Sequence, residues 1–210
     1  MVSAQNLLER LYPGRRAALK RQILLDALIC FLEHGIETTS IEMIRAKSET
    51  SVGAIYHHFK NKEGIVAALF FSALDDQTVL RDEYLKQAKT LQDVVFSLIH
   101  SYVDWVSEQP EFARFLNSAR FNMMKGEEHQ QLVQRNKNRN QNIFSQIANF
   151  EEFKALSLIP NELLLSLVIG STESYCRAWL SQRVKSNPKV YKDVLAKAAW
   201  SSLQDLRLKP

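Results

Sequence analysis

Residues 39–62 constrain the fold of this chain more than any other stretch. They predict two short helices separated by a tight polar break. Thr39 can cap the first helix with its hydroxyl, and Glu42, three residues later, can complete a capping box. Residues 48–51, Ser-Glu-Thr-Ser, then favour a turn, because their side chains compete with helical backbone hydrogen bonds. The stretch therefore predicts a helix-turn-helix over about residues 39–58.

The second helix of this pair is expected to begin near Ser51. Ile55 and Phe59 are four residues apart and would face inward. The outer side would then carry Val52, Gly53, Tyr56 and His57. Small residues at the front of such a helix allow its backbone to enter a DNA major groove, which is about 12 Å wide, and longer side chains behind them can contact phosphates and base edges.

With these features the sequence resembles the TetR family of bacterial transcriptional regulators. The resemblance lies in ILLDALICFLEHG (23–35), TTSIEMIRA (38–46), SVGAIYHHF (51–59) and KNKEGIVAAL (60–69). The chain departs from the family in the turn, where Glu49 and Thr50 replace the usual Gly and Val, and Arg45 stands where Ala is common. Glu49 is expected to shift the second helix slightly, and Arg45 to add a phosphate contact.

The resemblance and the helix pattern together predict the residues that contact DNA. Tyr56, Thr39 and Lys62 are expected at phosphates, with Lys62 in the first turn of a helix that Asn61 caps. The residues expected against base edges are Val52, Gly53 and His57, with Ser51 as a cap or a further phosphate contact. Phosphate contacts supply most of the affinity and base contacts most of the discrimination.

The rest of the chain predicts an all-α protein. Amphipathic segments lie near 91–108, 111–124, 128–148, 161–184 and 188–206, and nothing beyond about residue 85 resembles a strand. The predicted organisation is an N-terminal arm (1–14), a three-helix head with the helix-turn-helix (15–62) and a larger helical body for ligand binding and dimerisation (63–210). Residues 1–62 contain nine Lys and Arg against six Asp and Glu, which is +3 of the net +4. This modest excess suits a nucleic-acid-binding head.

Aromatic and soft apolar side chains are frequent in the middle segments. A packed helical core accounts for them, and the family resemblance adds the alternative of an effector pocket. The residues expected to line such a pocket, as apolar walls or polar anchors, are His100, Trp105, Phe115, Arg120, Phe121, Met124, Phe144 and Arg177. The basic run 134–142, QRNKNRNQN, is expected to be a solvated helix face, with a second DNA contact as the alternative.

The last two long segments, 161–184 and 188–206, carry more apolar surface than one helix face needs. In the family, the corresponding helices form a four-helix bundle with a second subunit, and Gly170 and Ala178 would permit close approach. A monomeric core is the alternative. A homodimer would place two recognition helices about 34 Å apart, which matches one turn of a palindromic operator.

These features predict a ligand-responsive, homodimeric regulator, most often a repressor in this family, that binds double-stranded operator DNA. The rival hypothesis is a helical adaptor without sequence-specific DNA binding. An enzyme is not expected, because neither a nucleophile motif nor a metal motif is present, and His57 and His58 point in different directions on a helix. Cys30 and Cys176 are expected to be buried thiols, no cofactor is expected, and the lack of a long apolar run or signal peptide predicts a cytoplasmic protein.

Overall fold

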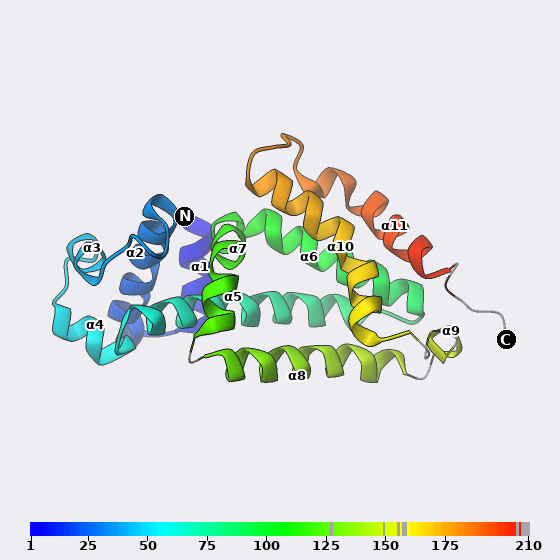
Figure 1. Ribbon diagram of the computed structural model, residues 1–210, viewed down its shortest axis with the longest axis horizontal. Helices are drawn as coiled ribbons and strands as arrows, with labels where there is room; N and C mark the ends of the chain where they lie inside the picture. Colours follow the sequence, from blue (N-terminus) through cyan, green and yellow to red (C-terminus); the bar gives the residue numbers. More distant parts are fainter. Residues whose placement is uncertain (127, 149, 155, 157–158, 205, 207–210) are drawn as a thin grey trace. The chain divides into compact units, whose positions relative to one another are not determined.

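The computed structural model describes residues 1–126, 128–148, 150–154, 156, 159–204 and 206, and every regular element among them is helical (Figure 1). This confirms the predicted all-α class. The chain divides into two compact units: unit 1 comprises residues 1–76 and 109–132, and unit 2 comprises residues 77–108 and 133–210. Residues 63–76 and 109–132, which we expected in the body, thus pack with the helix-turn-helix in unit 1.

Unit 1 contains the N-terminal helices, the first part of α5, and α7. Its elements are α1 (Val2–Leu11), a 3-10 turn (Arg15–Ala17), α2 (Ala18–His34), α3 (Ile41–Lys47), α4 (Val52–Phe59), the first part of α5 (Lys62–Leu85) and α7 (Pro110–Lys125). Most of the predicted N-terminal arm is the helix α1, along one face of which Ala4, Leu7 and Leu8 are buried. α2 ends at Gly35, whose positive φ of 83° favours glycine.

The core of unit 1 explains why α2 is apolar over most of its length. Ile23, Leu24, Ala27, Leu28 and Phe31 are all buried. The ring of Phe31 stacks on Phe115 of α7 with centroids 5.8 Å apart. α2 therefore serves as the central support on which the helix-turn-helix and α7 pack.

Unit 2 contains the end of α5 and the C-terminal helices. Its elements are α6 (Leu91–Glu108), most of α8 (His129–Ile147), α9 (Glu151–Lys154), α10 (Asn161–Leu180), a 3-10 turn (Pro188–Tyr191) and α11 (Lys192–Gln204). α6 packs against α10 and α11 through buried residues such as Ile99, Val103 and Ala196. The predicted segments agree with α6, α7, α8 and α10 to within a few residues, whereas α9 was not predicted.

Among the described residues, no helix is both long and apolar enough to cross a membrane.

Candidate functional site

The helix-turn-helix begins one residue later than the sequence suggested. Ser40, not Thr39, is the N-cap of α3, and its Oγ accepts a hydrogen bond from the Met43 backbone N–H at 3.2 Å. Glu42 does not complete a capping box with Thr39, because its carboxylate is paired with Arg45 at 2.7 Å. Arg45 is thus engaged on the surface of α3, where we had expected it to be available for a phosphate.

The turn between α3 and α4 places Glu49 in the left-handed region, at φ 48°. A non-glycine residue there is strained by about 1–2 kcal/mol, which explains why glycine is usual at this position in the family. The adjacent Ser48 is buried and donates to the Ile44 carbonyl at 2.8 Å. The turn is therefore held in place despite the unfavourable residue.

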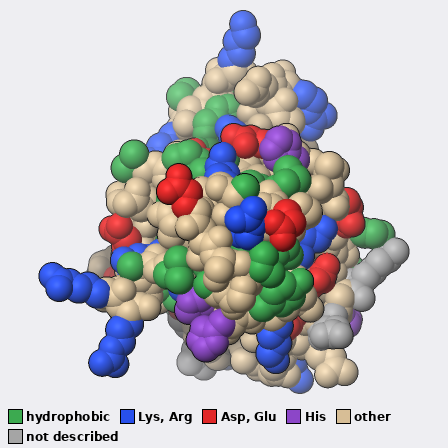
Figure 2. All heavy atoms as spheres, turned by 90° about the vertical axis from the view of Figure 1, so that its left-hand side faces the viewer, with side chains coloured by type: hydrophobic (Ala, Val, Ile, Leu, Met, Phe, Trp, Pro, Cys, Tyr) green, Lys and Arg blue, Asp and Glu red, His purple; other side chains and the backbone are tan. Residues whose placement is uncertain are grey.

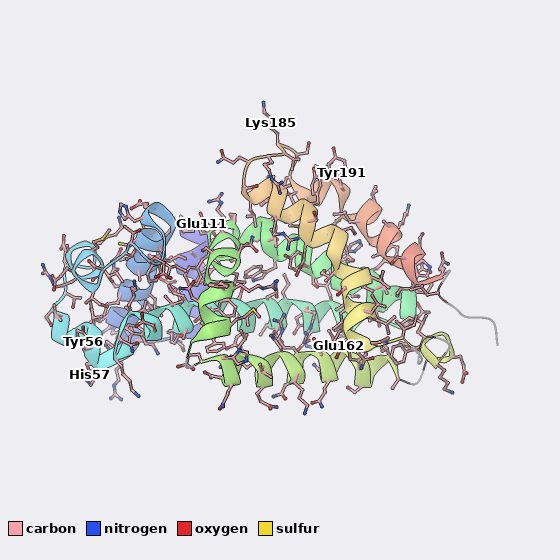
Figure 3. All side chains as sticks on the ribbon, viewed as in Figure 1. Tyr56, His57, Glu111, Glu162, Lys185 and Tyr191 are labelled. Atoms are coloured by element: carbon pink, nitrogen blue, oxygen red, sulfur yellow. The ribbon has the colours of Figure 1, made fainter. Side chains whose placement is uncertain are left out.

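α4 presents the outer face that the pattern predicted. Ser51 is its N-cap and accepts from the Ala54 N–H at 3.1 Å, while Ile55 and Phe59 are buried. Tyr56 is 49% exposed and His57 is also exposed, and Figure 3 shows both at the outer edge of α4.

The front of α4 is open. Val52 is half-buried and Gly53 is exposed. A Cβ added to Gly53 would meet only Ser51 Oγ, at 3.9 Å. The first turn of the helix can therefore lie flat against another surface.

Thr39 is not available for a phosphate contact. Its side chain is 1% exposed, and its hydroxyl lies 2.7 Å from the Gly35 carbonyl and 3.2 Å from that of Cys30, to which it donates. Its hydroxyl ties the C-terminal end of α2 to the start of the helix-turn-helix. The expected phosphate role of Thr39 is therefore replaced by a structural one.

Lys62 also has partners inside unit 1. Its ammonium donates to the carbonyls of Ile36 at 3.0 Å and Glu37 at 3.2 Å. The same turn is held from a second side, because the Asn122 amide of α7 donates to the Glu37 carboxylate at 2.5 Å. Lys62 thus fixes the α2–α3 turn in this structure instead of projecting freely from the start of α5.

The charge around α4 is mixed and modest. In Figure 2, which faces the side of α3 and α4, basic (blue) and acidic (red) side chains are interspersed. Burial, together with the charges of His57 and Lys20, lowers the pKa of His58 below its ordinary value, so His58 is neutral at pH 7. Arg21, near the start of α2, donates to the carbonyls of Tyr12 and Gly14 and so joins α1 to α2.

The eight residues expected to line an effector pocket are divided between the two units, four in each. In unit 1, Phe115 is buried against Phe31, while Arg120, Phe121 and Met124 are exposed on α7. Phe115 thus packs in the core of unit 1, and the expected pocket role of Arg120, Phe121 and Met124 stays a prediction.

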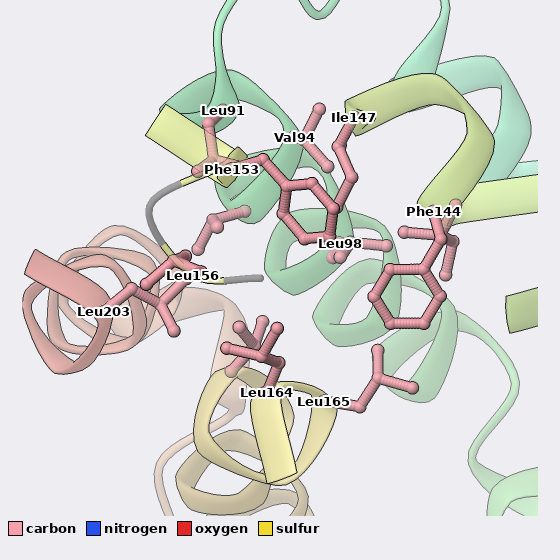
Figure 4. Close-up of a pocket in the computed structure, with 13 residues that line it drawn as sticks. Leu91, Val94, Leu98, Phe144, Ile147, Phe153, Leu156, Leu164, Leu165 and Leu203 are labelled. Carbon is pink, nitrogen blue, oxygen red and sulfur yellow. The ribbon is translucent and has the colours of Figure 1, made fainter. Parts of the chain in front are cut away.

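The remaining four lie in unit 2. Trp105 is buried in the packing of α6, His100 lies 2.9 Å from Asp193, and Arg177 pairs with Glu173 along α10. Phe144 lines a cavity within unit 2 (Figure 4).

That cavity lies inside unit 2 and is lined by hydrocarbon alone. Its volume is about 30 Å³. The lining residues come from α6, α8, α9 and its following turn, α10 and α11, and they are Leu91, Val94, Val95, Leu98, Ile143, Phe144, Ile147, Phe153, Leu156, Leu164, Leu165, Val168 and Leu203. Sequence reasoning missed most of them, because Leu and Val at helical spacing look the same in a solid core and in a cavity wall.

A buried carboxylate joins three elements of unit 2. Asp104 Oδ2 accepts from the Tyr84 hydroxyl of α5 at 2.6 Å and from Lys192 of α11 at 2.9 Å. Burial opposes ionisation of Asp104, but these two hydrogen bonds and the charges of Lys192 and Lys189 outweigh it and lower its pKa. Asp104 is therefore charged at neutral pH.

Neither cysteine suggests a reactive site. Cys30 and Cys176 are buried free thiols, and burial raises the pKa of both, to about 12 for Cys176. Within the described part of the chain, no group of three or more His, Cys, Asp or Glu side chains could hold a metal ion.

Comparison with known proteins agrees with this arrangement. Residues 23–69 match the family model for bacterial regulatory proteins, tetR family. The HTH-type transcriptional repressor Rv1474c of Mycobacterium tuberculosis is 32% identical over 104 residues, which are 49% of this chain and 53% of the repressor. The chain thus spans about half the length of this curated relative.

Two solved structures share the fold over most of the chain. A TetR family transcription regulator from Marinobacter aquaeolei VT8 superimposes with a TM-score of 0.73 at 17% identity, covering 90% of this chain and 96% of the other. The regulator FadR from Bacillus subtilis, solved in complex with stearoyl-CoA, gives a TM-score of 0.68 at 16% identity, covering 86% and 97%.

Proposed function

This chain belongs to the TetR family of bacterial regulatory proteins, and on that premise we propose that it is a DNA-binding transcriptional repressor. The observation that carries the proposal is the outer face of α4, where Gly53, Tyr56 and His57 are exposed while Ile55 and Phe59 anchor the helix from behind. This face has the composition that a major-groove helix needs. The relative Rv1474c is named a transcriptional repressor, which supports repression rather than activation as the proposed output.

We assign the DNA contacts by exposure. Val52, Gly53 and His57 lie against base edges, and Tyr56 donates its hydroxyl to a phosphate. Ser51 caps α4 with its side chain. A DNA phosphate can bind the backbone N–H groups in the first turn of that helix. Thr39 and Lys62 act from inside the domain by holding α3 and α4 at their angle.

The test is binding of the purified full-length protein to the DNA upstream of its own gene and to a shuffled duplex, by fluorescence anisotropy at about 150 mM salt. A preference of at least roughly a thousandfold supports an operator. Tyr56→Phe should weaken binding to all sequences alike, Val52→Ala should change which sequence is preferred, and Tyr191→Phe in unit 2 is the matched control for the loss of a hydroxyl.

Equal weak binding to both duplexes, together with failure to select any sequence from random DNA, would favour the helical adaptor instead. An adaptor would use the same exposed face of α4 for a protein partner. It would show no sequence preference at any salt concentration.

We propose that the protein acts as a homodimer through α10 and α11. The outer sides of these helices carry exposed apolar residues, including Leu163 and Val194. A Cβ added to Gly170 on α10 would meet no heavy atom within 4 Å, so the chain itself does not use the space that this glycine leaves. Small and apolar residues of this kind suit close packing against a second copy.

The proposed control is a population shift driven by a small molecule bound in unit 2. α5 is suited to transmit it, because residues 62–76 pack in unit 1 and residues 77–85 in unit 2. Release from DNA requires only that the effector bind the DNA-incompatible state better than the DNA-bound state. A dimer whose operator affinity no small molecule alters would contradict this part of the proposal.

A further inference from the structure

Both cations of α3, the first helix of the helix-turn-helix, are paired with carboxylates. The basic side chains of this helix are Arg45 and Lys47. Arg45 Nε donates to Glu42 Oε2 at 2.7 Å, one turn back along α3. The Lys47 ammonium lies 3.6 Å from Glu33 Oε2 of α2. Every residue of α3 is described, and neither of its cations is left without an anionic partner.

This pairing bears on DNA binding because of the place of α3 in the motif. In a helix-turn-helix the second helix enters the major groove, while the first helix crosses the sugar–phosphate backbone. Cations on the first helix can therefore bind phosphates, and such contacts give a protein its affinity for DNA of any sequence. In this chain a carboxylate already stands at each cation, in the place that a phosphate would take.

The pair of Glu42 and Arg45 leaves part of the guanidinium open. Glu42 accepts from Nε, and within the described part of the chain no other hydrogen bond or ion pair engages the Arg45 side chain. The side chains of Arg45 and Glu42 are 42% and 66% exposed. An exposed ion pair of this kind is weak, because solvent and salt screen it. A phosphate held in front of the guanidinium can therefore replace the Glu42 carboxylate.

We propose that Arg45 exchanges Glu42 for a DNA phosphate only when α4 is seated in its operator, so that Glu42 keeps this cation from other DNA. The inference rests on the proposed function and deepens it, since it names a residue that determines specificity. A guanidinium binds a phosphate best in a fixed, bidentate geometry. A seated α4 fixes α3 on the backbone and so supplies that geometry. Loosely bound DNA does not, and the neighbouring carboxylate then keeps the guanidinium.

This exchange discriminates between sequences without a further base contact. Wherever α3 lies on a duplex, the charge of Glu42 repels the phosphates. In the operator complex alone, the new contact of Arg45 with a phosphate offsets that repulsion. Specificity is then obtained partly by weakening the binding of the wrong DNA, which is a common device where charged surfaces meet.

The first test is fluorescence anisotropy of the full-length protein with its operator and with a shuffled duplex, between about 50 and 300 mM salt. Each phosphate that a cation neutralises contributes about 0.9 to the slope of log K against log salt. Arg45→Gln should therefore lower the operator slope by about 0.9, which is about fivefold in affinity at 150 mM salt, and leave the slope for the shuffled duplex unchanged. Equal losses on both duplexes, or no loss on either, would overturn the proposal.

Glu42→Gln should act on the other duplex. Without the carboxylate, Arg45 is available to any phosphate, so the shuffled duplex should gain about 0.9 in slope and about fivefold in affinity. Operator affinity should rise by about twofold at most, with its slope unchanged. Adding Arg45→Gln to this variant should restore the wild-type slope for the shuffled duplex. Equal gains on both duplexes, or a new base preference at the operator, would give Glu42 another role and overturn the proposal.

Glu83→Gln is the matched control. Glu83 likewise accepts from a cation three residues later, Lys86, at 2.6 Å, and both side chains are exposed. The substitution changes the net charge as Glu42→Gln does, but in unit 2, so both slopes should remain those of the wild type. Circular dichroism should show unchanged helicity for all variants, because each altered side chain lies at the surface. A gain that equals that of Glu42→Gln would mean that net charge alone acts.

The two duplexes separate this inference from the proposed function. A specific operator on which Arg45→Gln has no effect refutes the exchange and leaves the reader standing. Failure to find any operator, in upstream DNA or by selection from random DNA, refutes the reader and the exchange together. In that case a fivefold gain of Glu42→Gln on the shuffled duplex would still show that Glu42 masks Arg45.

Discussion

The hydrogen bond between Tyr84 and Asp104 predicts a measurable alkaline limit to the stability of unit 2. The hydrogen bond to Asp104, burial and the charge of that carboxylate raise the pKa of Tyr84 from its ordinary 10.0 to about 12. Because the folded-state pKa is raised, the neutral phenol stabilises the folded protein fully below pH 10. This stabilisation is lost as the pH rises through about 12.

The magnitude follows from the size of the shift. A pKa shift of about two units corresponds to about 2.7 kcal/mol of folding stability. Because Tyr84 is partly exposed to solvent, the expected stabilisation falls to roughly 1–2 kcal/mol. Tyr84→Phe should therefore lower the free energy of unfolding by about 1–2 kcal/mol at pH 8. For a chain of this length, this corresponds to a fall in Tm of a few degrees.

The assay is thermal unfolding followed by circular dichroism between pH 8 and 11.5, for wild type and Tyr84→Phe. The difference in stability should be constant to about pH 10 and then shrink. In parallel, absorbance at 295 nm should show that the variant lacks one tyrosine that ionises near pH 12. Asp104→Asn is the control, because without the carboxylate Tyr84 should ionise closer to pH 10.

A stability difference that persists undiminished to pH 11.5 would refute this reasoning. So would a Tyr84→Phe variant that retains every late-ionising tyrosine of the wild type. Either result would mean that the Tyr84 hydroxyl does not depend on the Asp104 charge.

Three further predictions concern the two units separately. Glu49→Gly should raise the free energy of unfolding by about 1 kcal/mol in urea denaturation, because it relieves the positive φ, and no gain would mean that the turn is unstrained. Gly64→Ala should destabilise the protein by about 1–3 kcal/mol and weaken DNA binding, because the added Cβ would collide with the Phe59 carbonyl at the α4–α5 junction. Chemical denaturation measures the loss of stability and fluorescence anisotropy the loss of DNA affinity. Unchanged stability and affinity would contradict the close contact. Val194→Arg should convert the proposed dimer to a monomer in light scattering, with helicity retained. The control is Val79→Arg, which changes an equally exposed valine on α5 and should leave the dimer intact. Dimers from both variants would exclude α11 as the interface.

Local sequence signals predicted most of the helices in this chain. Prolines and glycines interrupt helical patterns for local steric reasons: α2 ends before Gly35, and Pro110 is the first residue of α7. The cap of α3 was misassigned because Thr39 and Ser40 are equally good caps by residue type. The hydrogen bonds of Thr39 to carbonyls at the end of α2 decide between the two residues. These are tertiary contacts, which the local sequence does not encode.

The candidate pocket was much less predictable than the helices. Phe115 and Phe144 have the same hydropathy and similar helical neighbours, yet one fills the core of unit 1 and the other lines a cavity in unit 2. Periodicity shows which side of a helix is apolar, but a cavity is the space that several such sides leave unfilled. Its position depends on the way the helices pack together, which no single segment encodes.

The turn at Ile36 and Glu37 is attached at two points, to Lys62 at the start of α5 and to Asn122 near the end of α7. The surface that we propose to meet DNA is thereby held by two contacts from distant parts of the chain. In a genetic screen for loss of the proposed repression, loss of either contact would look like damage to the helix proposed to face DNA. Such mutants should keep the proposed effector binding and dimerisation, which separates them from lesions in unit 2.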